Sequence, residues 1–304
     1  MRHFIIITVL LINANSLFCQ DICVSYFRQL SIAEFEHHQG NTDVAIERFE
    51  KANANYPSCT GAGSKLDFAK MYLRINEKEK AYIIITEEIK NGYDLDNLKY
   101  IGVYESDLGS YYSLLLQHKD SLQRIFYSNL DSEALFFVKD MIALDQGITH
   151  ITNIPDTVKW DVRHQIFRLN IQKLADYTQE RGIIGYKEIG HYYTLVSLIL
   201  VHHRLDDDND IQNVNRLIRD YTVAIKKGNA SPGVIINLVD NMADIYDLNK
   251  PQIMGRYSDH QTNAFKKIRD ISKVDSIRLS YGLTTLKELS EITGISLPED
   301  YEVK

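Results

Sequence analysis

Residues that break regular structure are scarce in this sequence, which has five prolines and fifteen glycines among 304 residues. A fold made of many short strands needs many turns, and turns draw on these two residue types. No run of alternating apolar and polar residues, the pattern typical of half-buried strands, stands out. The sequence therefore predicts an all-α fold, with a short repeat-like array of helical hairpins followed by a multi-helix globular domain.

Basic residues are fewer than acidic ones: the sequence has 34 Lys and Arg residues and 41 Asp and Glu residues, so its formal net charge is -7. A dedicated nucleic-acid-binding protein needs a basic face, so the sequence predicts no nucleic-acid partner. The apolar stretch 192–201 is too short to span a bilayer. We expect it to form a central helix buried on all sides, and we expect no transmembrane span.

The N-terminal residues 1–19 have the pattern of a secretory signal peptide. Arg2 precedes the apolar run Phe4–Ile12, and a more polar segment follows it. We expect cleavage before Gln20 and export of the mature chain, which would then be periplasmic or secreted. The competing interpretation is lipidation of Cys19, which would anchor the protein to a membrane surface.

Two helical hairpins are predicted after this segment, at an offset of 36 residues. Small residues let antiparallel helices approach closely, and Gly40 makes the turn between the two helices of the first unit. Small or apolar residues recur at matching places: Ala33, Ala45, Phe49, Ala52 and Pro57 in the first unit, and Ala69, Ala81 and Ile85 in the second. This pattern resembles the tetratricopeptide repeat, a family of helical hairpins, over about residues 23–92.

The second unit departs from the family pattern at Glu88, which stands where the repeat has a small residue. Beyond it, residues 91–115 resemble the closing part of a bacterial variety of the repeat, and we interpret them as a cap. We assign residues 20–125 to this array. Repeat arrays of this kind mostly present surfaces to other proteins, so we expect a protein or peptide partner here.

Two cysteines, Cys23 and Cys59, remain after the expected cleavage. Two thiols are too few for a structural zinc site. An oxidising compartment permits a disulfide bond between them. The two residues hold equivalent places in neighbouring units, however, and such places are often about 10 Å apart, too far for a disulfide. Two separate buried thiols are therefore an equal alternative.

Residues 126–304 are predicted to form a second, helical domain. Short motifs follow one another in this part: Asp-Gln at 145–146, a glycine-framed turn at 182–190, a histidine at 203, Gln-x-x-Gly at 252–255 and Arg-x-x-x-Gly-Leu at 278–283. By the order and spacing of these motifs, about residues 135–290 resemble an uncharacterised bacterial family that is known only as a domain of unknown function. The resemblance implies no activity, because none is attached to that family.

The acidic stretch 206–210 matches the start of a calcium-binding loop. The match ends at Ile211 and Leu217, because such a loop requires a glycine at the first of these positions and a bidentate glutamate at the second. We interpret the stretch as a turn whose negative charge meets the dipole of the next helix. His202 and His203 are adjacent and would point about 100° apart on a helix, so they cannot easily share one metal ion. The sequence predicts no metal site and no cofactor.

One polar cluster is nevertheless a candidate site. Asp145 falls within the apolar stripe of its predicted helix, and a lone buried carboxylate is very costly, so it needs a partner. We expect Arg278 to hold it with two charge-assisted hydrogen bonds, and His203 to lie against an amide of Gln146 or Gln252. The candidate catalytic residues are Asp145, His203 and Asp240, and the candidate binding residues are Gln146, Gln252 and Arg278. Asp240 lies off the stripe of its own helix and is expected by default to face solvent.

Three functional interpretations follow. The leading one is an exported interaction or scaffold protein that binds its partner through the N-terminal hairpins. The second is a hydrolase-type enzyme that uses the polar cluster, although the sequence lacks a Gly-x-Ser-x-Gly motif, a His-Glu-x-x-His motif and a phosphate loop. The third is a protein that binds a small polar ligand at the same cluster. Convergence of the predicted side chains in space would favour the last two.

Overall fold

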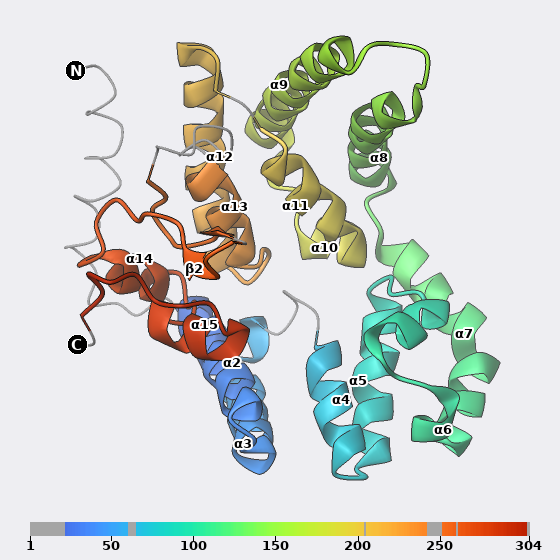
Figure 1. Ribbon diagram of the computed structural model, residues 1–304. Helices are drawn as coiled ribbons and strands as arrows, with labels where there is room; N and C mark the ends of the chain where they lie inside the picture. Colours follow the sequence, from blue (N-terminus) through green and yellow to red (C-terminus); the bar gives the residue numbers. More distant parts are fainter. Residues whose placement is uncertain (1–21, 60–64, 204, 242–250, 260, 303–304) are drawn as a thin grey trace.

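The computed structural model describes residues 22–59, 65–203, 205–241, 251–259 and 261–302. The expected signal peptide and its cleavage site lie outside these residues. Helices dominate the described part, and a single pair of two-residue strands accompanies them (Figure 1). The predicted all-α fold is therefore confirmed. No described helix is long and apolar enough to cross a membrane.

The helices of the first half are α2 (Ile22–His38), α3 (Thr42–Asn55), α4 (Leu66–Arg74), α5 (Lys78–Lys90), α6 (Glu105–Leu108) and α7 (Ser110–Asn129). Those of the second half are α8 (Ser132–Gly147), α9 (Asp156–Arg181), α10 (Tyr186–Ile189), α11 (Tyr193–Val201), α12 (Asp208–Lys226), α13 (Gly233–Asn241), α14 (Val274–Ser280) and α15 (Leu286–Thr293). Short 3-10 turns are η2 (Pro57–Cys59), η3 (Leu95–Ile101), η4 (Ile148–His150) and η5 (Gly190–Tyr192). Strands β1 (Ser258–Asp259) and β2 (Ala264–Phe265) pair antiparallel, with Ser258 opposite Phe265.

The predicted 36-residue offset is visible in the hairpins α2–α3 and α4–α5. The first helices of the two hairpins end at His38 and Arg74, and the second helices begin at Thr42 and Lys78. The turns match as well, because Gly40 and Asn76 both have positive φ angles, 86° and 63°. The alanines that suggested the offset are fully buried in both units: Ala33, Ala45, Ala69 and Ala81. The two hairpins are confirmed, while their membership of a named repeat family stays a proposal.

Cys23 and Cys59 form a disulfide bond, with their Cα atoms 5.2 Å apart. The expectation of about 10 Å was wrong because the two residues do not occupy equivalent places on stacked helices. Cys23 is in the first turn of α2, whereas Cys59 is in η2, well before the next helix begins at Leu66. The turn η2 returns the chain to the start of α2, where both cysteines are buried.

A glycine turn after a four-residue helix occurs twice in the fold, once before α7 and once before α11. Gly109 joins α6 to α7, and Gly190 leads from α10 through η5 to α11; their φ angles are 60° and 55°. In both cases a carboxylate in the short helix accepts a hydrogen bond from a backbone N–H three residues earlier: Asp107 from Tyr104, and Glu188 from Gly185, each at 2.8 Å. Gly190 also approaches Asn91 so closely that a Cβ atom there would lie 2.1 Å from the Asn91 carbonyl oxygen. The second turn therefore fixes α11 against the end of α5.

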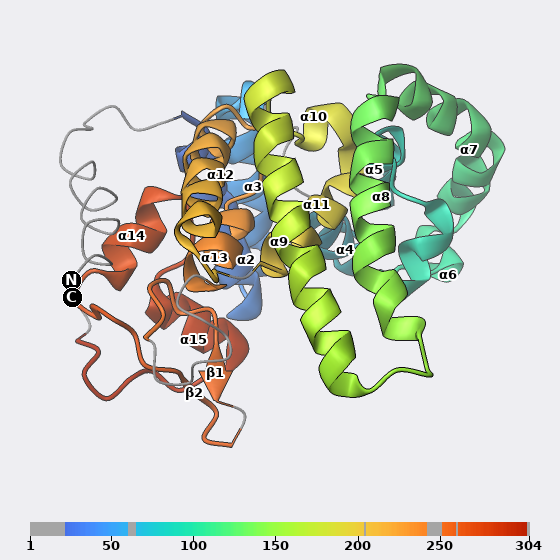
Figure 2. The same ribbon diagram turned by 90° about the horizontal axis from the view of Figure 1, so that it is seen from above.

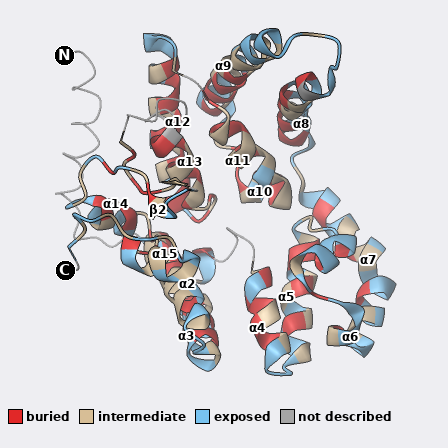
Figure 3. Cartoon of the chain, in the orientation of Figure 1, coloured by how far each residue is buried: buried red, intermediate tan, exposed pale blue. Residues whose placement is uncertain are grey.

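Two large hydrophobic clusters fill the molecule. One lies within the hairpins and α7, and the other joins α8–α13. Buried residues run along α12 and α13 (Figure 3), and α9 lies between α12 and α8 when the molecule is seen from above (Figure 2). The predicted domain boundary at 125/126 falls inside α7, which continues to Asn129. Cys23, Tyr26 and Phe27 of α2 belong to the second cluster, so the first helix packs with both halves.

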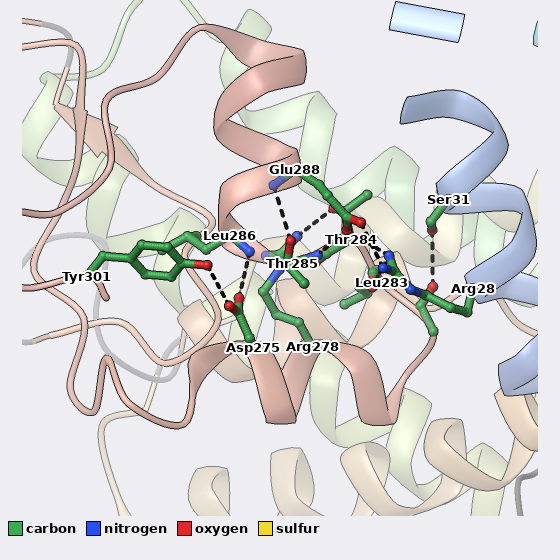
Figure 4. A network of polar contacts seen from close by, with 11 residues as sticks. Arg28, Ser31, Asp275, Arg278, Leu283, Thr284, Thr285, Leu286, Glu288 and Tyr301 are labelled. Atoms are coloured by element: carbon green, nitrogen blue, oxygen red, sulfur yellow. Dashed lines mark hydrogen bonds and ion pairs between the residues drawn. The ribbon is translucent and has the colours of Figure 1, made fainter. Parts of the chain in front are cut away.

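Helix α15 and the turn between α14 and α15 form polar contacts with α2. Arg28 donates two hydrogen bonds to the carboxylate of Glu288 on α15, at 2.7 and 2.8 Å, and the Ser31 hydroxyl donates to the Gly282 carbonyl. Gly282 contacts α2 so closely that a Cβ atom there would lie 2.5 Å from the Val24 carbonyl oxygen. Figure 4 shows this network, which we call the α2 clamp, running between α2 and the segment from α14 to α15.

Candidate functional site

Asp145 is fully buried on α8, as its place in the apolar stripe predicted, but its partner is not the expected one. Its Oδ2 atom accepts a hydrogen bond from Nδ1 of His202, at 2.6 Å. Arg278 instead donates to the main-chain carbonyl groups of Thr284 and Met254, each at 2.6 Å. The predicted Asp145–Arg278 pair is therefore wrong, because the segment that precedes α15 and the loop after α13 use the guanidinium to hold their own backbone.

His202 is the residue that completes the pair with Asp145. It caps the C-terminal end of α11, and its ring stacks on Phe167 of α9 with the centroids 4.8 Å apart. Since a carboxylate can only accept, Nδ1 carries the hydrogen and Nε2 is the atom left to act as acceptor when the ring is neutral. The side chain is 23% exposed. The pair thus holds an imidazole in a fixed orientation at the edge of the buried region.

His203, the histidine chosen from the sequence, is buried and makes no hydrogen bond to either of the predicted amides. Its Nδ1 atom donates to the Leu200 carbonyl at 2.8 Å, and its Nε2 atom has no hydrogen-bond partner. The expected contact with Gln146 or Gln252 is therefore wrong. Burial lowers the pKa of His203 to about 4, and the Leu200 carbonyl and Arg256 have smaller effects.

We expect His203 to make the fold less stable in acid. Above its unfolded pKa of about 6.5 the ring is neutral in both states and has no effect on pH dependence. As the pH falls from 6.5 toward 4, His203 binds a proton in the unfolded chain but not in the folded chain. This difference lowers the free energy of unfolding by up to about 3 kcal/mol. Urea unfolding at pH 7 and 4.5 should show this loss in the wild type and a smaller one in His203→Leu. An equal loss in both proteins would contradict the assignment.

Asp240 is 1% exposed, although it was expected to face solvent. Its carboxylate accepts hydrogen bonds from the backbone N–H groups of Ile253, Met254 and Arg256, at 2.8, 2.7 and 2.9 Å. The backbone of residues 253–256 therefore covers this face of the helix, which a helical wheel cannot reveal. Burial raises the pKa of Asp240, and the three N–H groups oppose that shift.

Gln252, like Asp240, forms its hydrogen bonds with main-chain groups. Its amide nitrogen donates to the carbonyl groups of Tyr257 and Lys266, at 2.9 and 2.8 Å, and its amide oxygen accepts from the Tyr257 N–H. Burial lowers the pKa of Arg278 to about 10. Asp240, Gln252 and Arg278 thus meet around residues 252–257, where they satisfy main-chain groups. The predicted cluster is divided between this loop and the Asp145–His202 pair, and Gln146 follows Asp145 directly on α8.

The acidic stretch 206–210 forms the predicted turn. Asp207 caps α12 and accepts hydrogen bonds from the backbone N–H groups of Asn209 and Asp210, which stabilises the helix start. Arg168 of α9 forms ion pairs with Asp206, Asp207 and Asp210. In the part of the chain that the structure describes, no group of three His, Cys, Asp or Glu residues is arranged to hold a metal ion.

The sequence reading missed a second carboxylate–imidazole pair, Glu88 with His191. Glu88 is 4% exposed, and its Oε2 atom lies 2.5 Å from His191 Nε2. Its Oε1 atom accepts from the Lys65 N–H, and the Tyr93 ring lies against His191. The sequence did contain a sign of this pair, because Glu88 stands at a position where the repeat pattern has a small residue, and a carboxylate buried there needs a partner. Each end of the α11 segment is thus attached to an earlier helix through a histidine and a buried carboxylate.

Comparisons with known proteins give this chain no relatives: no family model, no curated protein and no solved structure matches it significantly.

Proposed function

We propose that the protein is an exported interaction or scaffold module that binds a protein or peptide through its N-terminal helical hairpins. The observation that carries the proposal is the pair of hairpins with matching turns and matching buried alanines. Stacked hairpins of this kind present an extended surface rather than a closed pocket. The buried disulfide supports export, because such bonds persist in oxidising compartments.

The division of the predicted polar cluster supports an interaction module over a hydrolase. Asp240, Gln252 and Arg278 use their polar atoms to hold the backbone of one loop and its neighbours. An acid–base site needs its groups within hydrogen-bonding reach of one reacting atom. Asp145 and His202 lie within hydrogen-bonding reach of each other, but Asp240, Gln252 and Arg278 use their polar atoms elsewhere.

The segment from η3 to α7 continues the hairpin array, because α6 and α7 both pack on α5 of the second hairpin, and it is the best candidate for the partner surface. On α7, Leu116 and Tyr127 lie eleven residues apart, which places them on one face of the helix, and they are 50% and 60% exposed. Tyr100 and Tyr104, in the segment that leads to α7, are 77% and 56% exposed. Large aromatic side chains in such exposed positions are typical of the residues that dominate binding at protein interfaces. We call these four residues the α7 surface.

A variant with the four residues of the α7 surface changed to serine tests the proposal. Immobilised wild type should recover one protein partner from extracts of the source organism, and the variant should lose at least about tenfold of it, since such anchors each contribute 1 kcal/mol or more. A matched control changes Val223 and Leu279, which are 49% and 38% exposed on α12 and α14, to serine. It should recover the partner as the wild type does. Equal recovery by all three proteins, or none by the wild type, would contradict the proposal.

A further inference from the structure

Arg163 on α9 is a half-buried cation that forms no ion pair with any described carboxylate. Its Nε atom is buried, and none of the described groups accepts a hydrogen bond from it. Elsewhere on the same helix, Arg168 pairs with Asp207. Arg181 pairs with Glu133. A guanidinium is always charged and carries several N–H donors, so Arg163 can still bind an anionic acceptor.

Two aromatic rings fix the position of this guanidinium. The Cζ atom of Arg163 lies 5.1 Å from the centre of the Trp160 ring and 5.4 Å from the centre of the Phe167 ring. The three residues are spaced three and four apart, which places them on one face of α9. The face of an aromatic ring attracts a cation but does not take the place of a hydrogen-bond acceptor. The charge is therefore held in place while its donors stay available.

This part of α9 is open to solvent. None of residues 156–166 is buried, and the buried positions of the helix begin at Phe167. Trp160 is 43% exposed. Figure 2 shows the loop before α9 and the start of the helix extending past α11. A ligand can therefore reach Arg163 and Trp160 directly from solution.

The acidic residues near this place do not neutralise Arg163. The carboxylate of Asp145 is buried and binds His202, whose ring stacks on Phe167. Asp156, at the start of α9, already has a lysine partner. Asp161 is two residues before Arg163, so it lies on the opposite side of the helix. The exposed end of this face therefore favours a negatively charged group.

We propose that Arg163 and Trp160 form a surface site that binds the carboxylate or phosphate group of a small molecule. Two N–H groups of Arg163 donate to two oxygen atoms of the anion, a geometry that a planar guanidinium matches. The exposed part of Trp160 packs against the ring or chain that carries the anion. This site belongs to α9 and not to the α7 surface, so its test does not depend on the proposed partner binding.

Trp160 is the only tryptophan in the sequence, so its indole N–H gives a single signal in the nuclear magnetic resonance spectrum of the full mature chain with isotope-labelled tryptophan. Titration with benzoate or phenyl phosphate at pH 7 and constant ionic strength should shift this signal to a plateau, and the tighter of the two identifies the preferred anion. Benzyl alcohol, which has the ring but no charge, should bind at least about tenfold more weakly. Equal binding of benzyl alcohol, or no plateau with either anion, would overturn the proposal.

Two variants and a control locate the binding. Arg163→Met keeps the stem of the side chain but removes its charge and donors, and should weaken the binding of both anions by about tenfold or more. Arg163→Lys keeps the charge without the planar fork and should bind more weakly than the wild type. Arg219→Met removes the same charge from an exposed position on α12 and should leave binding unchanged. If Arg163→Met fails to fold, Arg163→Lys still decides, and wild-type affinity in a folded Arg163 variant would refute the site.

Discussion

Replacing Cys23 and Cys59 together by serine should lower the free energy of unfolding by about 4 kcal/mol, because the disulfide closes a loop across a sequence separation of 36 residues. The bond also packs against the end of α12, where a Cβ atom on Gly228 would lie 3.2 Å from Cys23 Sγ. Reduction therefore loosens the contact between the first helix and the second hydrophobic cluster.

Urea unfolding followed by far-UV circular dichroism measures this effect. The control is the wild type, unfolded and refolded in the presence of a reductant, which should be as unstable as the double-serine variant. Both cysteines are buried, so a reductant should act slowly on the folded protein. A loss below about 1 kcal/mol would show that the closed loop is not a main source of stability.

Glu88→Ala should destabilise the fold by about 3–5 kcal/mol, because it leaves His191 and the Lys65 N–H without their buried acceptor. The neighbouring Glu87 is a matched control. It is exposed and paired with Lys90 on the surface, so Glu87→Ala should change the stability by no more than about 0.5 kcal/mol.

A double-mutant cycle with His191→Ala separates the pair from its surroundings. The two single changes should cost more in sum than the double change, because the second removes a group that the first has already left without a partner. Additive losses would show that Glu88 and His191 stabilise the fold separately, contrary to the geometry.

The hairpins could be predicted from the sequence because their determinants are local. A buried alanine at a helix crossing or a residue with positive φ at a turn depends on a few neighbours, and these features recur after 36 residues. The pairing of Glu88 with His191 spans 103 residues, and no local pattern specifies it. What the sequence did show was a buried position that holds a carboxylate, which requires a partner without naming one.

The candidate site was predicted only in part. Asp145 was correctly expected to be buried and paired, but its partner is His202 rather than Arg278. The choice between His202 and His203 depends on where α11 ends, and boundaries of helices are poorly determined by sequence. Asp240 is buried by residues 253–256, which bind it through backbone N–H groups, and a backbone group leaves no mark in the sequence.

The α2 clamp has a consequence for the order in which the protein can fold. Arg28 is synthesised 260 residues before Glu288, its partner on α15. The polar contacts of α2 with the segment from α14 to α15 can therefore form only after nearly the whole polypeptide has been synthesised. Contacts between such distant residues form slowly, since the closure of a long loop precedes any gain in contact energy. The contact between the N-terminal and the C-terminal parts of the described chain is therefore one of the last to form.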